Sequence, residues 1–380
     1  MSRGLGSDLA PVWGTIVITN KTNNFVVIER DKHYLVLVNI YESLFSPYVR
    51  ATLVVNDKDD IIKNMKIKGD DEVVMYFNSV SSEEPQYYIL SINSIINESK
   101  RTDSRTNLLY FDCVCISYRD FYKRLSKRYV GDSSFILNDI LTNNVLMNLP
   151  SIYDGYDQFK LNFTQGNGEL DLQTNNKSVL DFIQLVCKID NKFFYQDAGG
   201  FHTKSLEDMI GVEKKGDIYF PVDQTKWKYQ NVAKSYTFEH FNNELLLDKN
   251  VIYPHYINLE PNHYVINQHE QTFSDIGNSD FFEHLQKNRS TQYVTGNIEN
   301  KMNKVISQFN LNSNLIKVKM NGNEKRRIGD KYYLDFKGNS NLNELHELYT
   351  GNWIITDIKH ELTMETYIQD ISFAKVNYSI

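Results

Sequence analysis

Three His-Glu pairs in this 380-residue sequence are the residues whose types suit hydrolytic chemistry: His269-Glu270, His346-Glu347 and His360-Glu361. A zinc protease of the common helical type binds its metal with two histidines four residues apart, and a glutamate beside the first acts as the base. None of the three pairs has a second histidine at that spacing. His360 lies in the run IITDIKHEL, which predicts a partly exposed histidine of a strand and not a metal ligand.

Other catalytic residue types are equally isolated. The sequence contains no Gly-x-Ser-x-Gly elbow, and Cys187 lies on an apolar helical face where a cysteine packs in the core. The carboxylate pairs Asp59-Asp60 and Glu83-Glu84 stand in polar, turn-like stretches. A glycosidase pair is defined by a distance in space and stays open at this point. Because no motif joins a nucleophile to its base, we predict no catalytic residue, no cofactor and no enzyme activity.

Cys113 and Cys115 lie two residues apart in the alternating run LLYFDCVCIS. In a strand both side chains face the same way, which fits either a buried pair or half of a metal site. No second Cys or His pair at ligand spacing follows, so we favour the buried pair and predict no metal site. Free thiols indicate assembly in a reducing, intracellular compartment.

The overall charge argues against a dedicated nucleic-acid binder. Lys and Arg total 41 against 48 Asp and Glu, a net charge of −7, whereas such binders neutralise phosphates with a basic surface. Two basic clusters, at residues 123–128 and at Lys325, Arg326 and Arg327, are interpreted as solvated faces or interface rims. The first residues, MSRGLGSDLAPVW, lack the apolar core of a signal peptide, and no apolar run approaches the ~18 residues that span a bilayer. We therefore expect a soluble protein without membrane insertion.

The elements that hold these residues fall into three zones. Strand-like runs with turn residues between them fill the chain up to residue 117, which predicts an antiparallel barrel or sandwich. Residues 118–215 add helices after Asp132 and Ser178, a strand pair around Gly166 and Gly168, and a hairpin at 197–200. Strands then return, interrupted by an irregular passage over 251–280 and an expected helix over 281–309.

One short stretch occurs twice. KGDDEVVMYF at residues 68–77 and IGDKYYLDF at 328–336 both read as a Gly-Asp turn that leads into a strand. In each case a strand precedes the turn and two more follow, so four strands recur in one order. We match Gly69 and Asp70 with Gly329 and Asp330 as the structural turns of a duplicated domain, because a spacing of about 260 residues exceeds any solenoid repeat. The alternative is chance similarity between β-rich segments.

A duplicated β-domain has a consequence for symmetry. Three such chains in a ring would place six similar domains around one axis, so the ring could meet a sixfold partner on one face and a threefold partner on the other. Open strand edges of one chain would be sealed by the next. Our candidate for such an edge strand is Leu109 to Ser117, where Val114→Pro would test it.

At this level of detail the chain resembles a known family. NNKSVLDFIQLVCKIDNKFFYQDAGGFHTKSL, at residues 175–206, and KRLSKRYVGDSSFILNDILTNNV, at 123–145, are similar to segments of the baseplate hub proteins of contractile-tailed, T-even-like bacteriophages and of the hub part of type VI secretion spikes. In those hubs a helix precedes a hairpin whose second strand carries Gly-Phe-His. The resemblance also implies that residues 123–130 are extended rather than helical.

The resemblance implies a domain plan of the α+β class dominated by strands, with two tube-like antiparallel barrel or sandwich domains and an inserted α+β domain. The expected boundaries are an N-terminal arm over 1–12, a first tube-like domain over 13–117, a middle domain over 118–215, a second tube-like domain over 216–250 and 311–380, and an insertion over 251–310.

The same resemblance implies a structural virion protein. Hubs of this family are homotrimers that join the sixfold tail tube protein to the threefold central spike protein, contact other baseplate proteins, and pass DNA through the lumen in transit. They act in the tail baseplate of the virion after assembly in the host cytoplasm. The alternative is a receptor- or glycan-binding module, to which the Tyr-rich passage VIYPHYINLEPNHYV at 251–265 could belong.

Overall fold

The structure is a computed structural model that describes most of the chain. The described residues are 12–20, 25–28, 35–57, 64, 66–78, 86–99, 107–149, 155–166, 168–220, 231–241, 264–267, 272–275, 314–336, 349–363 and 365–375. Residues 1–11 of the expected N-terminal arm and the helix expected over 281–309 lie outside them. None of the helices within these ranges is both long and apolar enough to cross a membrane.

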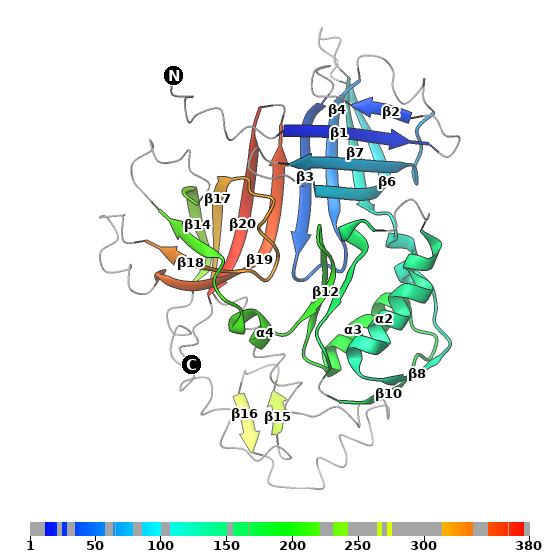
Figure 1. The fold of residues 1–380 in the computed structure, drawn as a ribbon, viewed down its shortest axis with the longest axis vertical. Helices are drawn as coiled ribbons and strands as arrows, with labels where there is room; N and C mark the ends of the chain where they lie inside the picture. The colour runs from blue at the N-terminus through cyan, green and yellow to red at the C-terminus, as the bar shows by residue number, and fades with distance from the viewer. Residues whose placement is uncertain are drawn as a thin grey trace.

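A single antiparallel-rich sheet of 13 strands dominates the described residues (Figure 1). The predicted α+β class with a majority of strands is therefore confirmed. In chain order its members are β1 (Val12–Thr19), β2 (Phe25–Ile28), β3 (Leu35–Ser43), β4 (Arg50–Asn56), β5 (Glu72–Asn78), β6 (Gln86–Ser99), β7 (Asn107–Cys115), β13 (Gly216–Tyr219), β14 (Ala233–Phe241), β17 (Asn314–Asn321), β18 (Lys331–Asp335), β19 (Gly351–Leu362) and β20 (Tyr367–Lys375).

The strands before residue 117 form what we call the first β-unit, β1 to β7. Their alternating sequence explains their burial: Val73, Met75 and Phe77 of β5 are buried, while the residues between them are partly exposed. These side chains share one hydrophobic cluster with inward residues of β1, β3, β4, β6 and β7. The prediction that Leu109 to Ser117 is an open edge strand was wrong. Strand β7 pairs with β4 on one side and with β6 on the other, so it lies inside the sheet.

The second β-unit consists of β13, β14 and β17 to β20, with its own hydrophobic cluster around Trp353. Its strands pair in the order β14-β17-β20-β19-β18, and those of the first unit in the order β3-β4-β7-β6-β5. Both units carry a bulge at the same step, after Ile92 in β6 and after Ile355 in β19. They differ at the end of the series, where β5 pairs antiparallel with β1 but β18 pairs parallel with β13.

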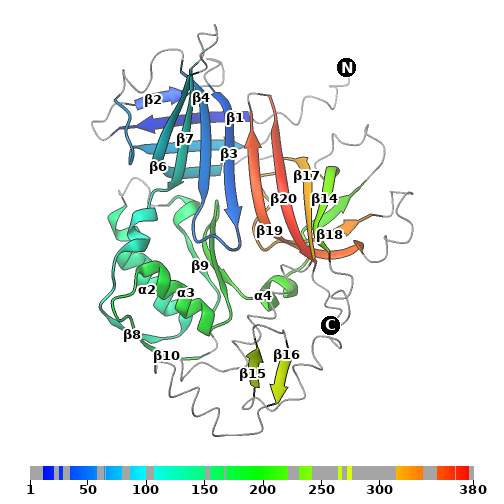
Figure 2. The ribbon, with the colours of Figure 1, turned by 180° about the vertical axis from the view of Figure 1, so that it is seen from behind.

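The two β-units meet edge to edge through their backbones. The second half of β19, Asp357 to Leu362, pairs antiparallel with β3 from Ser43 back to Val38. Figure 2, seen from behind, shows these two strands side by side at the centre, with the remaining strands fanning out to either flank. Backbone hydrogen bonds therefore join the two units into one continuous sheet.

The middle unit lies below this sheet and has a third hydrophobic cluster. Its helices begin where predicted: Asp132 caps α2 (Ser133–Asn144) and Ser178 caps α3 (Val179–Ile189). The hairpin expected at 197–200 is also confirmed, as β11 (Phe193–Asp197) and β12 (Gly200–Lys204). Helix α4 (Leu206–Gly211) and 3₁₀ turns at Tyr118–Tyr122, Leu146–Asn148 and Asp157–Phe159 complete it.

Two details of this region differ from the sequence prediction. The strands around Gly166 and Gly168 do not pair with each other: β9 (Leu161–Phe163) pairs parallel with β12, and β10 (Leu170–Gln173) pairs antiparallel with β8 (Arg128–Gly131). Alternation predicts strands but carries no information on their partners. The passage expected to be irregular contains a short hairpin, β15 (Tyr264–Asn267) with β16 (Thr272–Asp275). The extended path expected for residues 123–130 is confirmed by Lys123 and β8.

Candidate functional site

The second Gly-Asp turn closes on itself and on β19. Arg327 N donates to Asp330 Oδ2 at 2.9 Å, and Asp330 N donates to Arg327 O at 3.2 Å. Gly329 has a φ of +81°, and its N donates to Ile355 O at 2.9 Å, while Ile355 N donates to Asp330 O at 3.0 Å. The aspartate thus ties the loop to the bulge in β19.

The first turn repeats this pattern one residue later than the sequence alignment placed it. Lys68 N donates to Asp71 Oδ2 at 2.7 Å, Asp70 N to Ile92 O at 2.7 Å, and Ile92 N to Asp71 O at 2.8 Å. Asp70, with a φ of +72°, is therefore the counterpart of Gly329. Matching the two Gly-Asp pairs by residue type was therefore wrong by one position. Aspartate tolerates the left-handed conformation that the turn requires, so Asp70 can take the place that glycine has in the second turn.

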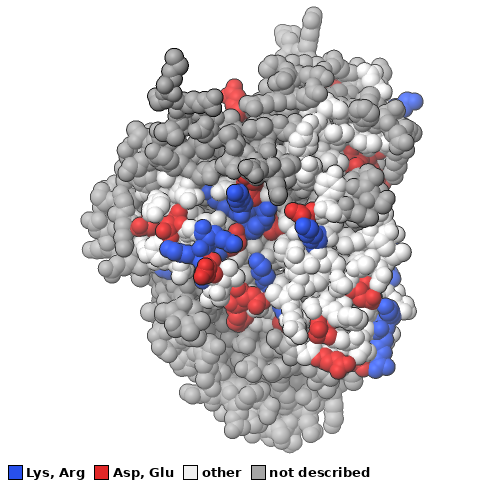
Figure 3. All heavy atoms as spheres, viewed as in Figure 1, with Lys and Arg blue, Asp and Glu red and all other residues white. Residues whose placement is uncertain are grey.

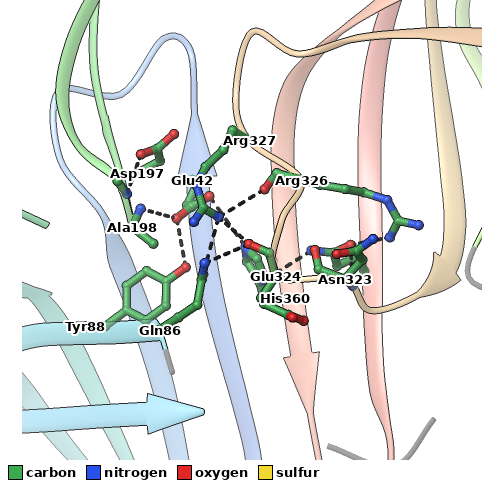
Figure 4. Close-up of polar contacts among 12 residues, drawn as sticks. Glu42, Gln86, Tyr88, Asp197, Ala198, Asn323, Glu324, Arg326, Arg327 and His360 are labelled. Atoms are coloured by element: carbon green, nitrogen blue, oxygen red, sulfur yellow. Dashed lines mark hydrogen bonds and ion pairs between the residues drawn. The ribbon is translucent and has the colours of Figure 1, made fainter. Parts of the chain in front are cut away.

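The loop that carries the second turn lies beside a buried polar cluster where the two β-units and the middle unit meet, which we call the junction (Figure 4). Its centre is Glu42 of β3, whose side chain is fully buried. Glu42 Oε1 accepts hydrogen bonds from Tyr88 Oη and from Ala198 N, both at 2.8 Å. Its Oε2 lies 3.5 Å from His360 Nε2. One carboxylate thus connects β6, the β11–β12 turn and β19.

His360 was expected to be partly exposed, but its side chain is 0% exposed. The prediction failed because it followed the polar type of the residue, whereas alternation along β19 places His360 on the same buried face as Ile358 and Leu362. His360 Nδ1 lies 2.8 Å from Tyr367 Oη and 3.3 Å from Gln369 Nε2. Burial raises the pKa of Tyr367 well above its ordinary value, as it does for Tyr88.

The basic cluster at 325–327 also differs from its interpretation as a solvated face. Arg326 is wholly buried and donates from Nη1 to Asn321 O at 2.8 Å and to Gln369 Oε1 at 2.6 Å. Burial lowers the pKa of its guanidinium. Arg327 donates to Gln86 Oε1 at 3.4 Å and to Glu324 O. Arg326 thus fixes the β17–β18 loop within the second unit, and Arg327 connects this loop to Gln86 of the first unit.

Asp197 brings the middle unit into the same junction. Its Oδ1 lies 2.9 Å from His202 Nε2 and accepts from Gly199 N at 2.7 Å. Burial alone would raise the pKa of this carboxyl, but the hydrogen bond and charge of His202, with the charge of Arg327, outweigh it and lower the pKa. The ionised carboxylate is thus the form that the folded chain stabilises.

This pKa shift gives a pH dependence that we expect to measure. Because the folded-state pKa of Asp197 is depressed, its stabilising contribution is present above the unfolded value of about 3.9 and is lost as pH falls through the folded value. We expect Asp197→Asn to lower the urea midpoint at pH 7 and to flatten its decline in the acid range.

The matched control for this experiment is Asp171→Asn. The hydrogen bond from Arg128 lowers the pKa of Asp171 as well, but that ion pair is exposed on the surface. Solvent screens it, so the midpoint should hardly move. Equal effects of the two variants would contradict the role of the buried carboxylate.

The junction is a buried connection between units. A glutamate, a histidine and a tyrosine joined by polar contacts resemble a proton relay, and the side chains of Glu42, His360 and Tyr88 are all shielded from solvent. Among the described residues no group of three or more His, Cys, Asp or Glu side chains could hold a metal ion. Cys113, Cys115 and Cys187 are buried and form no disulfide, in agreement with the predicted packing roles.

The charged surface shows no single-sign field on the face seen in Figure 3, where acidic and basic side chains are interspersed around the centre.

The sequence contains one signal of the junction residues that the sequence analysis missed. Val38, Ile40 and Glu42 occupy the inward positions of β3, so Glu42 is a carboxylate in a core pattern. A charge at such a position requires a buried partner.

With this geometry in view, the chain can be compared with known proteins. No protein-family model matches it, and no curated protein matches it in sequence. The tail protein from Neisseria meningitidis MC58 superposes with a TM-score of 0.56 at 6% identity, covering 95% of this chain and 96% of its own. The 43 kDa tail protein of prophage MuSo2 from Shewanella oneidensis gives 0.57 at 10% identity, covering 96% and 98%.

A component of the type VI secretion system from E. coli aligns over 91% of this chain and 75% of its own, at 9% identity and a TM-score of 0.49. The first two superpositions each cover nearly the whole of both chains. They confirm the predicted resemblance at the level of the fold: this chain has the fold of phage tail proteins.

Proposed function

We propose that this chain is a structural, non-enzymatic virion protein, the subunit of a trimeric baseplate hub that joins a sixfold tail tube to a threefold central spike. The observation that carries the proposal is internal: two β-units of one chain share the strand order β3-β4-β7-β6-β5 and β14-β17-β20-β19-β18. With the common bulge and the common turn, this repetition supports duplication of one ancestral domain.

A duplicated unit suits an adaptor. Three chains present six similar β-units to a tube with sixfold symmetry, while the middle unit, present once per chain, provides three equal contacts for a spike. The partners of the proposed hub are accordingly the tail tube protein, the spike protein and neighbouring baseplate proteins. DNA would touch the lumen only during genome ejection. Similarity of fold to the Neisseria and Shewanella tail proteins supports this assignment.

The junction supports the same role mechanically. Glu42 and His360 lie out of solvent between units that must keep a fixed mutual orientation to follow a ring. Buried polar groups that are hydrogen-bonded to one another specify one arrangement more strictly than apolar contacts do. The proposed hub therefore carries its two β-units as a single rigid body.

The solution mass of the purified chain tests this function. Light scattering over a range of concentrations should give three times 44.4 kDa for the chain alone, and a complex holding three copies of the chain when tube or spike protein is added. A mass of one chain under every condition would contradict the hub, and would favour a free-standing binding module.

A further inference from the structure

The long strand β19 has two partners along one edge. Its first residues, Gly351 to Ile354, pair with β18, and its second half, Asp357 to Leu362, pairs with β3 of the first β-unit. The bulge after Ile355 separates the two halves. The contact between the β-units therefore uses the part of β19 that extends beyond β18.

Strand β6 has the same two-part form in the first β-unit. Its residues Gln86 to Ser91 pair with β5, and a bulge follows Ile92. Ser94 pairs with Asp112 just after this bulge, as Asp357 pairs with Ser372 in the second unit. The segment Ser94–Ser99 is thus the counterpart of Asp357–Leu362, but among the described residues only β7 pairs with it.

Strand β14 is in turn the counterpart of β3. Asn39 connects through Thr52 of β4 to Asp112, and Thr237 connects through Lys317 of β17 to Ser372. Strand β3 uses both edges, for β4 and β19, whereas β14 ends the sheet with β17 as its one strand partner in the described part of the chain. Each strand of the β19–β3 contact therefore has a counterpart, Ser94–Ser99 of β6 and β14, whose corresponding edge has no strand partner in the described part of the chain.

Those two edges lie on opposite flanks of the molecule. Figures 1 and 2 show β14 at one side of the continuous sheet and β6 toward the other, with β3 and β19 between them. They cannot pair within one chain. Exposed residues mark both edges: Ile96 is 62% exposed in β6, and Ser235 and Thr237 are exposed in β14. An open strand edge with an exposed large apolar side chain is a template for strand pairing.

We infer that the edge Ser94–Ser99 of β6 pairs antiparallel with β14 of a second copy of this chain, repeating between chains the β19–β3 contact within each chain. The inference rests on the proposed ring, whose subunit contact it specifies. A head-to-tail contact of this kind closes into a ring when its rotation matches that of the internal contact. The backbone groups of both edges then find partners in the assembly.

The internal contact also fixes the register of the proposed one. Glu361 lies opposite Asn39 within the chain. The pairing of β6 with β7 matches that of β19 with β20, and it makes Glu98 the counterpart of Glu361. The pairing of β3 with β4 matches that of β14 with β17, and it makes Thr237 the counterpart of Asn39. Glu98 of one copy therefore faces Thr237 of the next.

Paired cysteines at these positions test the register. The full-length double variant Glu98→Cys and Thr237→Cys, treated with a short bifunctional maleimide, is expected to yield covalently joined chains up to three times 44.4 kDa on a denaturing gel. Residues directly opposite across an antiparallel pair have Cβ atoms about 5 Å apart, within reach of such a linker. The three native cysteines are buried and give the parent chain a low background.

The control pair is Asn97→Cys with Thr237→Cys, shifted by one residue, which places the two thiols on opposite faces of the sheet. It should remain uncrosslinked, although a monofunctional maleimide added after unfolding in urea shows that both thiols are present. Crosslinking of both pairs, or of neither while light scattering shows a trimer, would overturn this contact and leave the hub standing. A parent chain that stays monomeric alone and with tube or spike protein would instead refute the hub and the contact together.

Discussion

Glu42→Ala is expected to lower the free energy of unfolding by roughly 3 kcal/mol, because it leaves two buried donors without their acceptor. Those donors are Tyr88 Oη and Ala198 N, each 2.8 Å from Glu42 Oε1. Neither group can turn to water, since both lie inside the junction. The loss also reaches the contact between the β-units, where Glu42 stands opposite Ile358.

Two milder variants separate the carboxylate from its surroundings. Glu42→Gln keeps the shape and one acceptor oxygen and should cost about 1 kcal/mol, as should Tyr88→Phe, which removes a single hydrogen bond. Urea unfolding followed by circular dichroism gives the midpoint and slope for each variant. If Glu42→Ala is no worse than Glu42→Gln, the three-way connection through Glu42 does not contribute as described.

Much of the secondary structure was accessible from the sequence because it depends on local signals. Asp132 and Ser178 begin helices through hydrogen bonds to residues three positions later, Phe135 and Asp181. Strand alternation also placed most strands of both β-units. The turn at Gly200 was visible from its glycine pair, whose second member has a φ of +128°.

The junction was not accessible in this way, because its residues come together from separate units. Arg326 appeared in a run of three basic residues, and nothing local shows that Gln369 and Asn321 O receive its guanidinium in the interior. His360 faces Glu42 of β3, some 320 residues earlier in the chain, and nothing near His360 in the sequence indicates that partner. Burial of polar groups by a distant partner is a tertiary property.

The repeat of the two β-units could be predicted from the sequence only in part. Its existence was visible as recurring strand order, but the matched residues were displaced by one, since the hydrogen bonds equate Asp71 with Asp330 and not Asp70. Backbone conformation, rather than residue identity, defines the equivalence. The same correspondence of bulges and turns supplies the register of the proposed contact between copies.

The sharpest steric test of the junction is Gly322→Ala, at the start of the β17–β18 loop. A Cβ at this position would overlap the ring of Tyr367. That ring is buried and held by His360 Nδ1 at 2.8 Å and by Gln369 Nε2 at 3.1 Å, so it has no free rotamer to adopt. We expect a loss of about 3 kcal/mol, at the upper end of the usual cost of overpacking.

Gly168→Ala is the matched control, because nothing lies within 4 Å of the Cβ it would add. Its urea midpoint should stay close to that of the parent chain. The Gly322 variant should in addition loosen the attachment of the β17–β18 loop, whose Asn323 N donates to Gln369 Oε1 at 3.1 Å. Since Arg326 and Arg327 follow in the same loop, increased hydrogen exchange of β3 and β19 would show that the loop orients the two β-units. Unchanged exchange with lowered stability would confine the role of Gly322 to the second unit.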